Sequence, residues 1–509
     1  MANTWECFKF RSQHVGETGM RERESRKNLL FSKIVTWPLS SWVTAGMKLV
    51  QLCSVALYVL SYCVVPFSDG DPAYYVIIGR GLLQDHVLPY RYAFDHKPFA
   101  TYVFYGLWDK LAPFYPGKFT LLAVLLSGVF VAVGRVFGSF NRIVAFAILT
   151  VCGAIFDVLS GNTELVVVVG EALCLALMLK GIDSAKTGLF FLAGFIATLT
   201  VNVNYLAAVC FVGPVALLLF SPGWFRLSRC SMTIFGGVVE LSALFSPYFM
   251  VGHGALPLYF SMQRGFLSHY GATLSDRLLC MCWMTFYLAL MLPILVGWFR
   301  HFPVQLSEVA SRRTLILPVW FFSAFPATLL SGHPYQHYFT LCFAPAALML
   351  AILLRENALP SRFALTPLCV TVVVCMGVEA QRNSNIALYT SRVDYGHIAR
   401  LVGDARVLDI RTFHAVFYQS DLKPFDVYLF SDHIDILFRE NAWKRYMEDL
   451  QQRPLYVVAP YEGCKRHVVE EPLCQQLQDH YTQIYAVNIP HKHKNGPNKF
   501  SLSLYKIKG

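Results

Sequence analysis

Long apolar runs recur along the chain and are separated by short polar turns. Each run holds about 16–22 residues, close to the roughly 20 that a helix needs to cross a bilayer. The pattern predicts a polytopic α-helical membrane protein with about eleven spans. The expected spans cover residues 47–66, 117–138, 142–158, 164–180, 187–203, 205–220, 231–250, 277–299, 314–331, 337–354 and 361–378.

Residues 97–112 are apolar but short, and they contain charged side chains. If this segment does not span and the N-terminus is cytoplasmic, the Lys and Arg clusters of the later turns fall on the cytoplasmic side, as the positive-inside rule requires. We therefore predict a helix at the membrane interface. Its aromatic residues Tyr102, Phe104, Tyr105 and Trp108 are expected at the depth of the lipid headgroups.

The last part of the chain changes character. "ARVLDIRTF", "PLYVVAPY", "TQIYAVNI" and "KFSLSLYKI" are typical of short strands, and "EEPLCQQLQDHY" is typical of a helix. We predict a basic cytoplasmic tail over residues 1–45, a membrane module over 46–379 and a small α/β domain outside the membrane over 380–509. Sequence alone favours a cap or docking role for this domain.

Composition supports the membrane interpretation. Only 15% of the residues are charged and 55% are hydrophobic, whereas soluble domains carry about 25% charged residues. The net charge of +11 then reflects topology, because Lys and Arg mark cytoplasmic turns. The bilayer is the expected partner, and nucleic acid is not.

Cysteine spacing gives no metal motif. Most of the 14 cysteines lie in apolar runs, where Cys behaves as a small hydrophobic residue. Cys464 and Cys474, in the polar C-terminal part, could form a disulfide or remain two free thiols.

The loop after the first apolar run gathers ionisable residues. Asp71 precedes Pro72, which is a helix-start signal, so a plain capping role is one interpretation. Apolar positions 74, 75, 78 and 82 would form one face of a helix lying flat on the membrane. Arg80 would then be free to reach a headgroup.

A second helix start follows in the same loop. Asp95 is the expected cap, and Pro98 lies in the first turn. Lys97 stands at this helix N-terminus beside His96, although a helix N-terminus attracts anions rather than cations. A Lys here suits a bound anion such as phosphate; the alternative is a side chain that extends to water.

The segment "DPAYYVIIGRGLLQDHVLPYRYAFDHKPF" resembles the first external loop of glycosyltransferases of the GT-C fold that use lipid carriers. The similar branch contains protein mannosyltransferases that use dolichyl-phosphate-mannose, aminoarabinose transferase and the RgtA-type lipopolysaccharide enzymes. "SGNTELVVVVGEALCLAL" and "SGHPYQHYFTLCFAPAAL" agree with it. The resemblance covers roughly residues 47–350. The chain departs from the family at Lys97-Pro98-Phe99, where two prolines are common, and lacks the family's frequent acidic pair.

The resemblance implies a GT-C-like bundle with two juxtamembrane helices in the first external loop. It implies transfer of a sugar from a polyprenyl-phosphate carrier to a glycan, lipid or protein acceptor, usually with inversion. By position, Asp71 would be the catalytic base and Lys97 the main phosphate ligand. Further phosphate candidates are Arg80, His96, His333, His337 and Tyr338, and sugar or acceptor candidates are Glu164, Asp157, Tyr74 and Tyr335.

Other polar residues carry weaker expectations. Arg264, His269 and Tyr270 are expected to close over the donor. Glu171, inside a span, is either functional or a hydrogen-bonded tie between helices. We expect Glu240, Asn202 and Asn204 to bond between helices.

Two other functions stay open. A secondary transporter or lipid flippase would place its key polar groups at mid-membrane on broken helices, and a polymerase or ligase of lipid-linked sugars would use a diphosphate-linked donor. We expect a bacterial inner membrane with a periplasmic C-terminal domain. No cofactor is predicted, and a divalent metal is left open.

Overall fold

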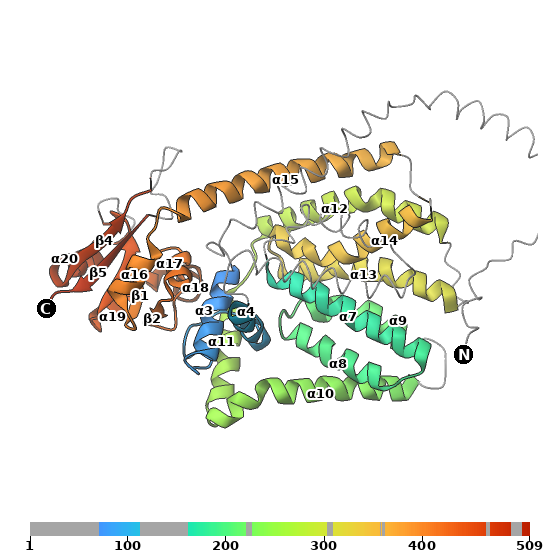
Figure 1. Cartoon of the computed structure of the whole chain (residues 1–509), viewed down its shortest axis with the longest axis horizontal. Helices are drawn as coiled ribbons and strands as arrows, with labels where there is room; N and C mark the ends of the chain where they lie inside the picture. Colours follow the sequence, from blue (N-terminus) through green and yellow to red (C-terminus); the bar gives the residue numbers. More distant parts are fainter. Residues whose placement is uncertain are drawn as a thin grey trace, which may run out of the picture. The chain divides into compact units, whose positions relative to one another are not determined.

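The computed structural model describes residues 71–111, 161–219, 226–302, 309–356, 358, 362–464, 469–489 and 501–509. Among these residues, 3 helices are long and apolar enough to cross a membrane: α7 (Thr163–Ser184), α10 (Arg226–Val251) and α12 (Leu274–His301). The 3₁₀ helix η3 (Gln336–Cys342) and α14 (Phe343–Arg355) meet the same requirement together, with a 46° bend between them. The chain is a helical membrane protein with several apolar spans (Figure 1).

Further helices continue the apolar pattern. They are α8 (Gly188–Val201), α9 (Ala207–Leu219), α13 (Val309–Ser331) and α15 (Arg362–Thr390). The expected spans at 47–66, 117–138 and 142–158 lie outside the described residues, so the number eleven stays a prediction. Helix α15 runs continuously across residue 379, where we expected the membrane module to end.

Two short helices form the opening loop: α3 (Asp71–Leu83) and α4 (Phe99–Leu111). Each has 13 residues, about 20 Å of helix, which is too short for a 30 Å hydrocarbon core. The helices cross at two glycines. A Cβ atom on Gly106 would lie 2.7 Å from the carbonyl oxygen of Gly79, so only glycine permits this approach.

This crossing corrects two expectations. Tyr102, Tyr105 and Trp108 are buried in protein rather than placed among headgroups. Helix α3 is buried from Pro72 to Gly79 on all sides, so it has no lipid-facing stripe. The physical reason is that α4 covers one side of α3 and the C-terminal domain covers another. The centroid of the Tyr74 ring lies 3.6 Å from the ring centroids of both His414 and Phe430.

The C-terminal domain is a mixed α/β unit, as predicted. Its 5-stranded sheet has the order β2-β1-β3-β5-β4, in which β1 runs parallel to β2 and β3, and β5 runs antiparallel to β3 and β4. All four predicted strands and the predicted helix are present. The elements are α16 (Tyr395–Val402), β1 (Arg406–Asp409), α17 (Ala415–Ser420), β2 (Lys423–Pro424), α18 (Ser431–Phe438), η4 (Arg439–Asn441), α19 (Ala442–Gln451), β3 (Tyr456–Pro460), α20 (Glu471–His480), β4 (Tyr481–Val487) and β5 (Leu502–Ile507).

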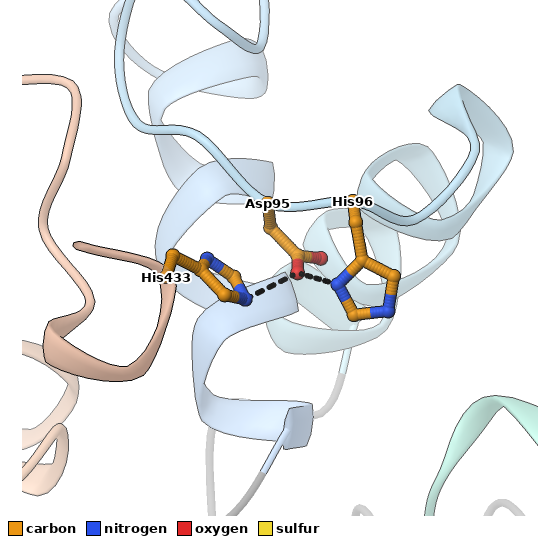
Figure 2. A group of neighbouring side chains, drawn as sticks. All are labelled: Asp95, His96 and His433. Carbon is orange, nitrogen blue, oxygen red and sulfur yellow. Dashed lines mark ion pairs between the residues drawn. The ribbon is translucent and has the colours of Figure 1, made fainter. Parts of the chain in front are cut away.

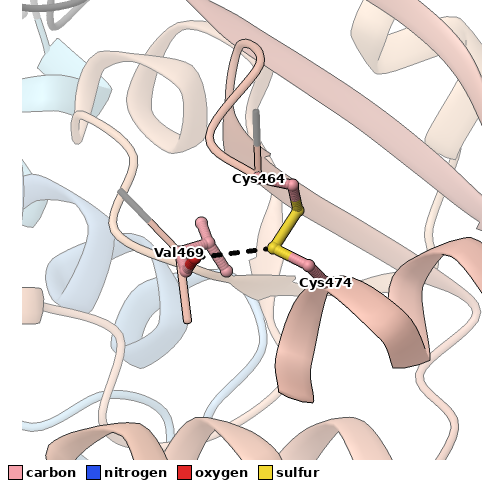
Figure 3. Close-up of a disulfide and its surroundings, with 3 residues drawn as sticks. All are labelled: Cys464, Val469 and Cys474. Carbon is pink, nitrogen blue, oxygen red and sulfur yellow. Dashed lines mark hydrogen bonds between the residues drawn. A yellow bond between two sulfur atoms is a disulfide. The ribbon is translucent and has the colours of Figure 1, made fainter. Parts of the chain in front are cut away.

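Both faces of the central strand β3 are buried. Alternate side chains of a strand point to opposite faces; Val457 belongs to a core with Leu473 and Leu477 of α20, and Val458 belongs to the large core that also contains α3. A disulfide joins Cys464 to Cys474 on α20, which settles the open question about these thiols (Figure 3).

Candidate functional site

The structure brings three of the predicted site residues together from three helix starts. Asp71 opens α3, Lys97 stands two residues before α4, and Glu164 lies in the first turn of α7. The carboxyl groups of Glu164, Asp71 and Asp95 all act electrostatically on the Lys97 ammonium group. Burial alone lowers the pKa of Lys97, but these negative charges raise it above its ordinary value. Lys97 therefore stays charged although it is only 6% exposed.

The backbone of Lys97 is fixed from two sides. Its carbonyl oxygen accepts hydrogen bonds from the Tyr102 hydroxyl at 2.9 Å and from the Gln263 side-chain amide at 2.8 Å. Gln263 belongs to α11 (Ala255–His269), so a helix outside the opening loop helps to hold the backbone of Lys97 in place. A side chain whose own backbone is held in this way keeps its position when a ligand exchanges.

Glu164 is buried and held by an amide. The side chain of Asn204, in the turn between α8 and α9, donates to Oε1 of Glu164 at 2.8 Å and to the Thr163 hydroxyl at 3.0 Å. Asn204 is thus the interhelical hydrogen bonder we expected, and its partner is a site residue. The amide orients one oxygen of Glu164.

Four tyrosines surround this group. The charges of Asp71 and Glu164 act on the hydroxyls of Tyr75, Tyr105 and Tyr338. Tyr270 is near Lys97 and Asp71, and burial raises the pKa of its hydroxyl, so it remains a donor. The Tyr105 hydroxyl donates to the carbonyl oxygen of Gly161, just before α7.

The residues of the "GHPYQHY" segment differ in how deeply they lie in the site. Tyr338 is buried against the carboxylates of the site. The His333 ring lies 4.4 Å from the ring of Tyr270, and His333, Tyr335 and His337 continue outward as a stack of nearly parallel rings. Tyr335 is 45% exposed, so this stack forms the outer side of the site.

Arg80 is placed differently from our expectation. Its guanidinium pairs with Asp109 of α4 at 2.7 Å, donates to the Tyr418 carbonyl at 2.7 Å and meets Asp421 at 3.2 Å. It therefore ties both loop helices to the C-terminal domain and is not free to reach a headgroup. Tyr74 packs into the same domain, against His414 and Phe430.

The remaining predicted residues differ in where they lie. The His96 ring packs against the rings of both Phe266 and Tyr270, which also contact each other. Arg264 and His269 are exposed on α11. Asp157 lies outside the described residues. Asp95 does not cap α4 as we expected: its carboxylate meets the backbone N–H of Lys97 at 3.4 Å, inside the loop.

The acids inside the spans have neutral partners. The indole N–H of Trp320 donates to Glu171 at 2.7 Å, between α13 and α7. The amide of Asn202 donates to Glu240 at 3.1 Å, between α8 and α10, as expected. These contacts give Glu171 a role as a tie between helices.

Sequence reasoning missed Gln263 as a site residue and His433 as a neighbour of the loop. Nothing in the local pattern marks either one, because their partners lie 166 and 339 positions away along the chain.

The fold has counterparts among solved structures. ArnT from Cupriavidus metallidurans in the apo state superposes with a TM-score of 0.54 at 12% identity, covering 91% of this chain and 98% of that chain. ArnT bound to undecaprenyl phosphate gives a TM-score of 0.53 at 12% identity, covering 90% and 98%. The Archaeoglobus fulgidus oligosaccharyltransferase in its complex with zinc and sulfate reaches 0.40 at 12% identity, over 86% and 72%. No protein-family model and no curated protein sequence matches the chain. The structure therefore has the GT-C fold that the loop motifs indicated.

Proposed function

We propose that this protein is a membrane glycosyltransferase that moves a sugar from a polyprenyl-phosphate carrier to an acceptor hydroxyl outside the cytoplasm. The observation that carries the proposal is the buried Lys97 ammonium group among the carboxyl groups of Asp71 and Glu164. An ammonium group can hold a phosphate, and an adjacent carboxylate can take a proton. The solved ArnT complex with undecaprenyl phosphate adds support by fold.

In the proposed reaction, the acceptor hydroxyl oxygen attacks the anomeric carbon of the donor. Asp71 takes the hydroxyl proton as the new C–O bond forms. The bond between the anomeric carbon and the phosphate oxygen breaks, and its electron pair leaves with the carrier phosphate. Lys97 stabilises the charge that grows on this phosphate. A direct displacement inverts the configuration of the sugar.

Glu164 is assigned to the sugar or acceptor. Its Oε1 accepts from Asn204, so the carboxylate is already oriented and does not need to reorganise when a hydroxyl arrives. The buried hydroxyl of Tyr338 stands near the same carboxyl groups and supplies a neutral donor. The stack of the half-buried His333 and His337 with the exposed Tyr335 is the proposed entry side for phosphate or sugar.

Two contacts support a location on the non-cytoplasmic face. The opening loop is joined to the C-terminal domain by the ion pair of Arg80 with Asp421, so the site and the domain lie on the same side. That domain carries the Cys464–Cys474 disulfide, and disulfides persist in oxidising compartments such as the periplasm. We assign the protein to cell-envelope glycan modification, including lipopolysaccharide, in a bacterial inner membrane.

A transporter or flippase receives less support. That alternative places its key polar groups at mid-membrane on broken helices, whereas the residues assigned to the site lie at or just before the starts of α3, α4 and α7.

The test compares Lys97→Met with Lys444→Met, an exposed lysine on α19. Purified protein is titrated with undecaprenyl phosphate, and transfer is measured with a polyprenyl-phosphate-linked radiolabelled sugar and lipid A or membrane protein as acceptor. We expect Lys97→Met to lose carrier binding and transfer by at least about 100-fold, while Lys444→Met keeps both. Equal carrier binding by the two variants would contradict the assignment of Lys97, and absence of transfer by the unmodified protein to every acceptor would contradict the proposed activity.

A further inference from the structure

The sheet of the C-terminal domain contains a topological switch point between β1 and β3, which are parallel neighbours. After β1 the chain turns to α17, whose Val416 and Phe417 belong to the core that also contains α3. After β3 it turns to α20, whose Leu473 and Leu477 belong to the core on the opposite face of the sheet. In open sheets with parallel strands, ligands bind outside the carboxyl ends of the two strands at such a point.

The backbone is strained after both of these strands. Arg411 follows β1 with a φ of 55°, and Glu462 follows β3 with a φ of 51°. The other described residues of this domain that combine a side chain with a positive φ lie at helix ends, where this backbone is common: Asp421, Arg439 and Arg453. Side-chain-bearing residues held at positive φ elsewhere cost stability and concentrate at binding and catalytic sites. Both strand ends at the switch point carry this sign.

Six side chains from β1, the turn after it, α18 and α19 meet at the carboxyl end of β1. They form the switch-point cluster, which consists of Asp409, Arg411, Asp432, Asp435, Trp443 and Tyr446. The guanidinium group of Arg411 pairs with Asp435 and lies 4.5 Å from the centroid of the Trp443 ring. The centroids of the Trp443 and Tyr446 rings are 5.6 Å apart. The charges of the four other members act on the Tyr446 hydroxyl, which therefore lies among them.

Two hydrogen-bond donors of the cluster are not used within the part of the chain that the structure describes. They are the hydroxyl of Tyr446 and Nε of Arg411, both buried and without a hydrogen-bond partner. Tyr446 is only 1% exposed. A buried donor without an acceptor is costly, and native proteins rarely keep one without a reason. Two such donors side by side call for a ligand that brings oxygen atoms.

The charges of the cluster argue against an anion as this ligand. Asp409, Asp432 and Asp435 place three carboxyl groups around the one guanidinium group of Arg411, and like charges repel. The turn from Asp409 to His414 contains no glycine, unlike the glycine-rich turns that hold phosphates in doubly wound sheets. Helix α17 has only six residues, too few to add a substantial dipole.

A neutral sugar fits the same groups. Sugar hydroxyls both donate and accept, as serine and threonine hydroxyls do. Asp432 and Asp435 lie three residues apart, and so on one side of α18, where they offer acceptor oxygens. Tyr446 and Arg411 offer the two unused donors. The half-buried Trp443 adds an aromatic ring beside them, against which the C–H groups of a sugar can pack.

The cluster lies beside the opening loop. Helix α18 supplies Asp432 and Asp435 and also carries His433, whose Nε2 stands 3.4 Å from Oδ1 of Asp95 in that loop (Figure 2). Asp432 and His433 are adjacent in the sequence. A glycan held at the cluster is therefore next to the segment that carries Lys97.

We propose that the switch-point cluster of the C-terminal domain binds a neutral sugar unit of a glycan. The binding does not depend on the proposed transfer reaction; only the identification of this glycan with the acceptor rests on the proposed function. In that identification, the C-terminal domain holds the acceptor beside the site rather than acting as a separate cap.

The experiment uses the full chain in detergent, without any donor. An array of neutral oligosaccharides finds the sugar that binds most tightly, and calorimetry then measures its Kd. Tyr446→Phe removes one unused hydroxyl, and Tyr481→Phe is the matched control, because the Tyr481 hydroxyl donates to the carbonyl oxygen of Pro454 at 3.0 Å. We expect a Kd that is about tenfold higher in Tyr446→Phe and unchanged in Tyr481→Phe.

Thermal unfolding without sugar separates a ligand-binding hydroxyl from a structural one. Loss of a buried hydroxyl that has no partner should leave the unfolding temperature of Tyr446→Phe unchanged or raise it, whereas Tyr481→Phe should unfold at a lower temperature. A second pair of variants, Asp432→Ala and Asp404→Ala, changes exposed residues of the same domain. Only Asp432→Ala should bind the sugar more weakly.

Several results would overturn the proposal. They are the absence of binding by every oligosaccharide of the array, an equal Kd in Tyr446→Phe, and a marked loss of stability in Tyr446→Phe without sugar. Tighter binding of inorganic phosphate or of a nucleotide in the same titration would assign an anionic ligand and would overturn it too. Oligosaccharide binding by a protein that transfers no sugar would support the proposal and contradict only the proposed function.

Discussion

Acids in two regions of this molecule have different partners. At the site, the half-buried Asp71 of α3 and the buried Glu164 of α7 act electrostatically on the charged Lys97. Inside the membrane helices, Glu171 and Glu240 face the neutral donors of Trp320 and Asn202. An acid that accepts a hydrogen bond from a neighbouring helix holds the two helices together. Acids that share one ammonium group keep carboxylate oxygens that can accept a proton. The ammonium group can pair with a phosphate in their place, and the proposed reaction needs both properties.

The sharpest contrast is between Asp71→Asn and Glu171→Gln. Asparagine cannot accept a proton at neutral pH, so we expect Asp71→Asn to lower the transfer rate by about 100-fold to 10,000-fold with carrier binding retained. Glutamine still offers an oxygen to the Trp320 indole, so Glu171→Gln should keep most of the activity. The measurement is transfer of labelled sugar at saturating donor. A fully active Asp71→Asn variant removes the base from the mechanism.

The next effect concerns the helix crossing that places the site. In Gly106→Val, the new side chain would start 2.7 Å from the Gly79 carbonyl oxygen, so α3 and α4 must separate. We expect a loss of about 1–3 kcal/mol in stability and a larger loss of transfer, because Asp71 opens α3 and Lys97 stands just before α4. Thermal unfolding and transfer are measured together.

The matched control for that variant is Gly265→Ala on α11. A Cβ atom there meets nothing within 4 Å. Alanine favours a helix more than glycine does, so stability should stay equal or rise slightly. If Gly106→Val behaves like this control, the close crossing is not what positions the site.

A smaller effect separates the two asparagines. Asn204→Ala removes the amide that orients Glu164, and Asn202→Ala removes the amide that bonds Glu240. Each change breaks one hydrogen bond to an acid, so both should cost about 1–3 kcal/mol in stability. Only Asn204→Ala should also lower transfer, by about tenfold. Equal transfer by the two variants would mean that Glu164 has only a structural role.

Local pattern predicted part of this architecture well. The four strands of the C-terminal sheet and helix α20 follow from short apolar runs bounded by polar residues. The two-residue strand β2 (Lys423–Pro424) is too short to leave a pattern. The Asp71-Pro72 pair predicted the start of α3, which is described from Asp71 on, whereas Asp95 was the expected cap of α4 and this helix begins only at Phe99.

Contacts between distant segments were the part that local pattern could not predict. Arg80 looked free because Asp109 and Asp421 lie 29 and 341 positions away. Aromatic residues suit both a headgroup layer and a packed core, so Tyr102 and Tyr105 were assigned to the wrong one. No local pattern marked His433, because its partners belong to the opening loop, which we assigned to the membrane module, whereas His433 belongs to the C-terminal domain.

The remaining prediction concerns pH and a buried acid in the C-terminal domain, Asp409, whose partner is the neutral Thr412. Burial raises the pKa of Asp409 to about 7, although hydrogen bonds from Thr412 oppose the shift. Between about pH 4 and pH 7, the folded chain holds a proton that the unfolded chain has released, so stability falls as pH rises. In Asp409→Asn this slope should disappear, and the variant's advantage should grow from pH 5 to pH 8 by about 1–4 kcal/mol. Thermal unfolding of the full chain measures it, with the exposed Asp404→Asn as control. An unchanged slope would mean that Asp409 is ionised throughout, in which case a neutral donor alone can hold a buried carboxylate in its charged form.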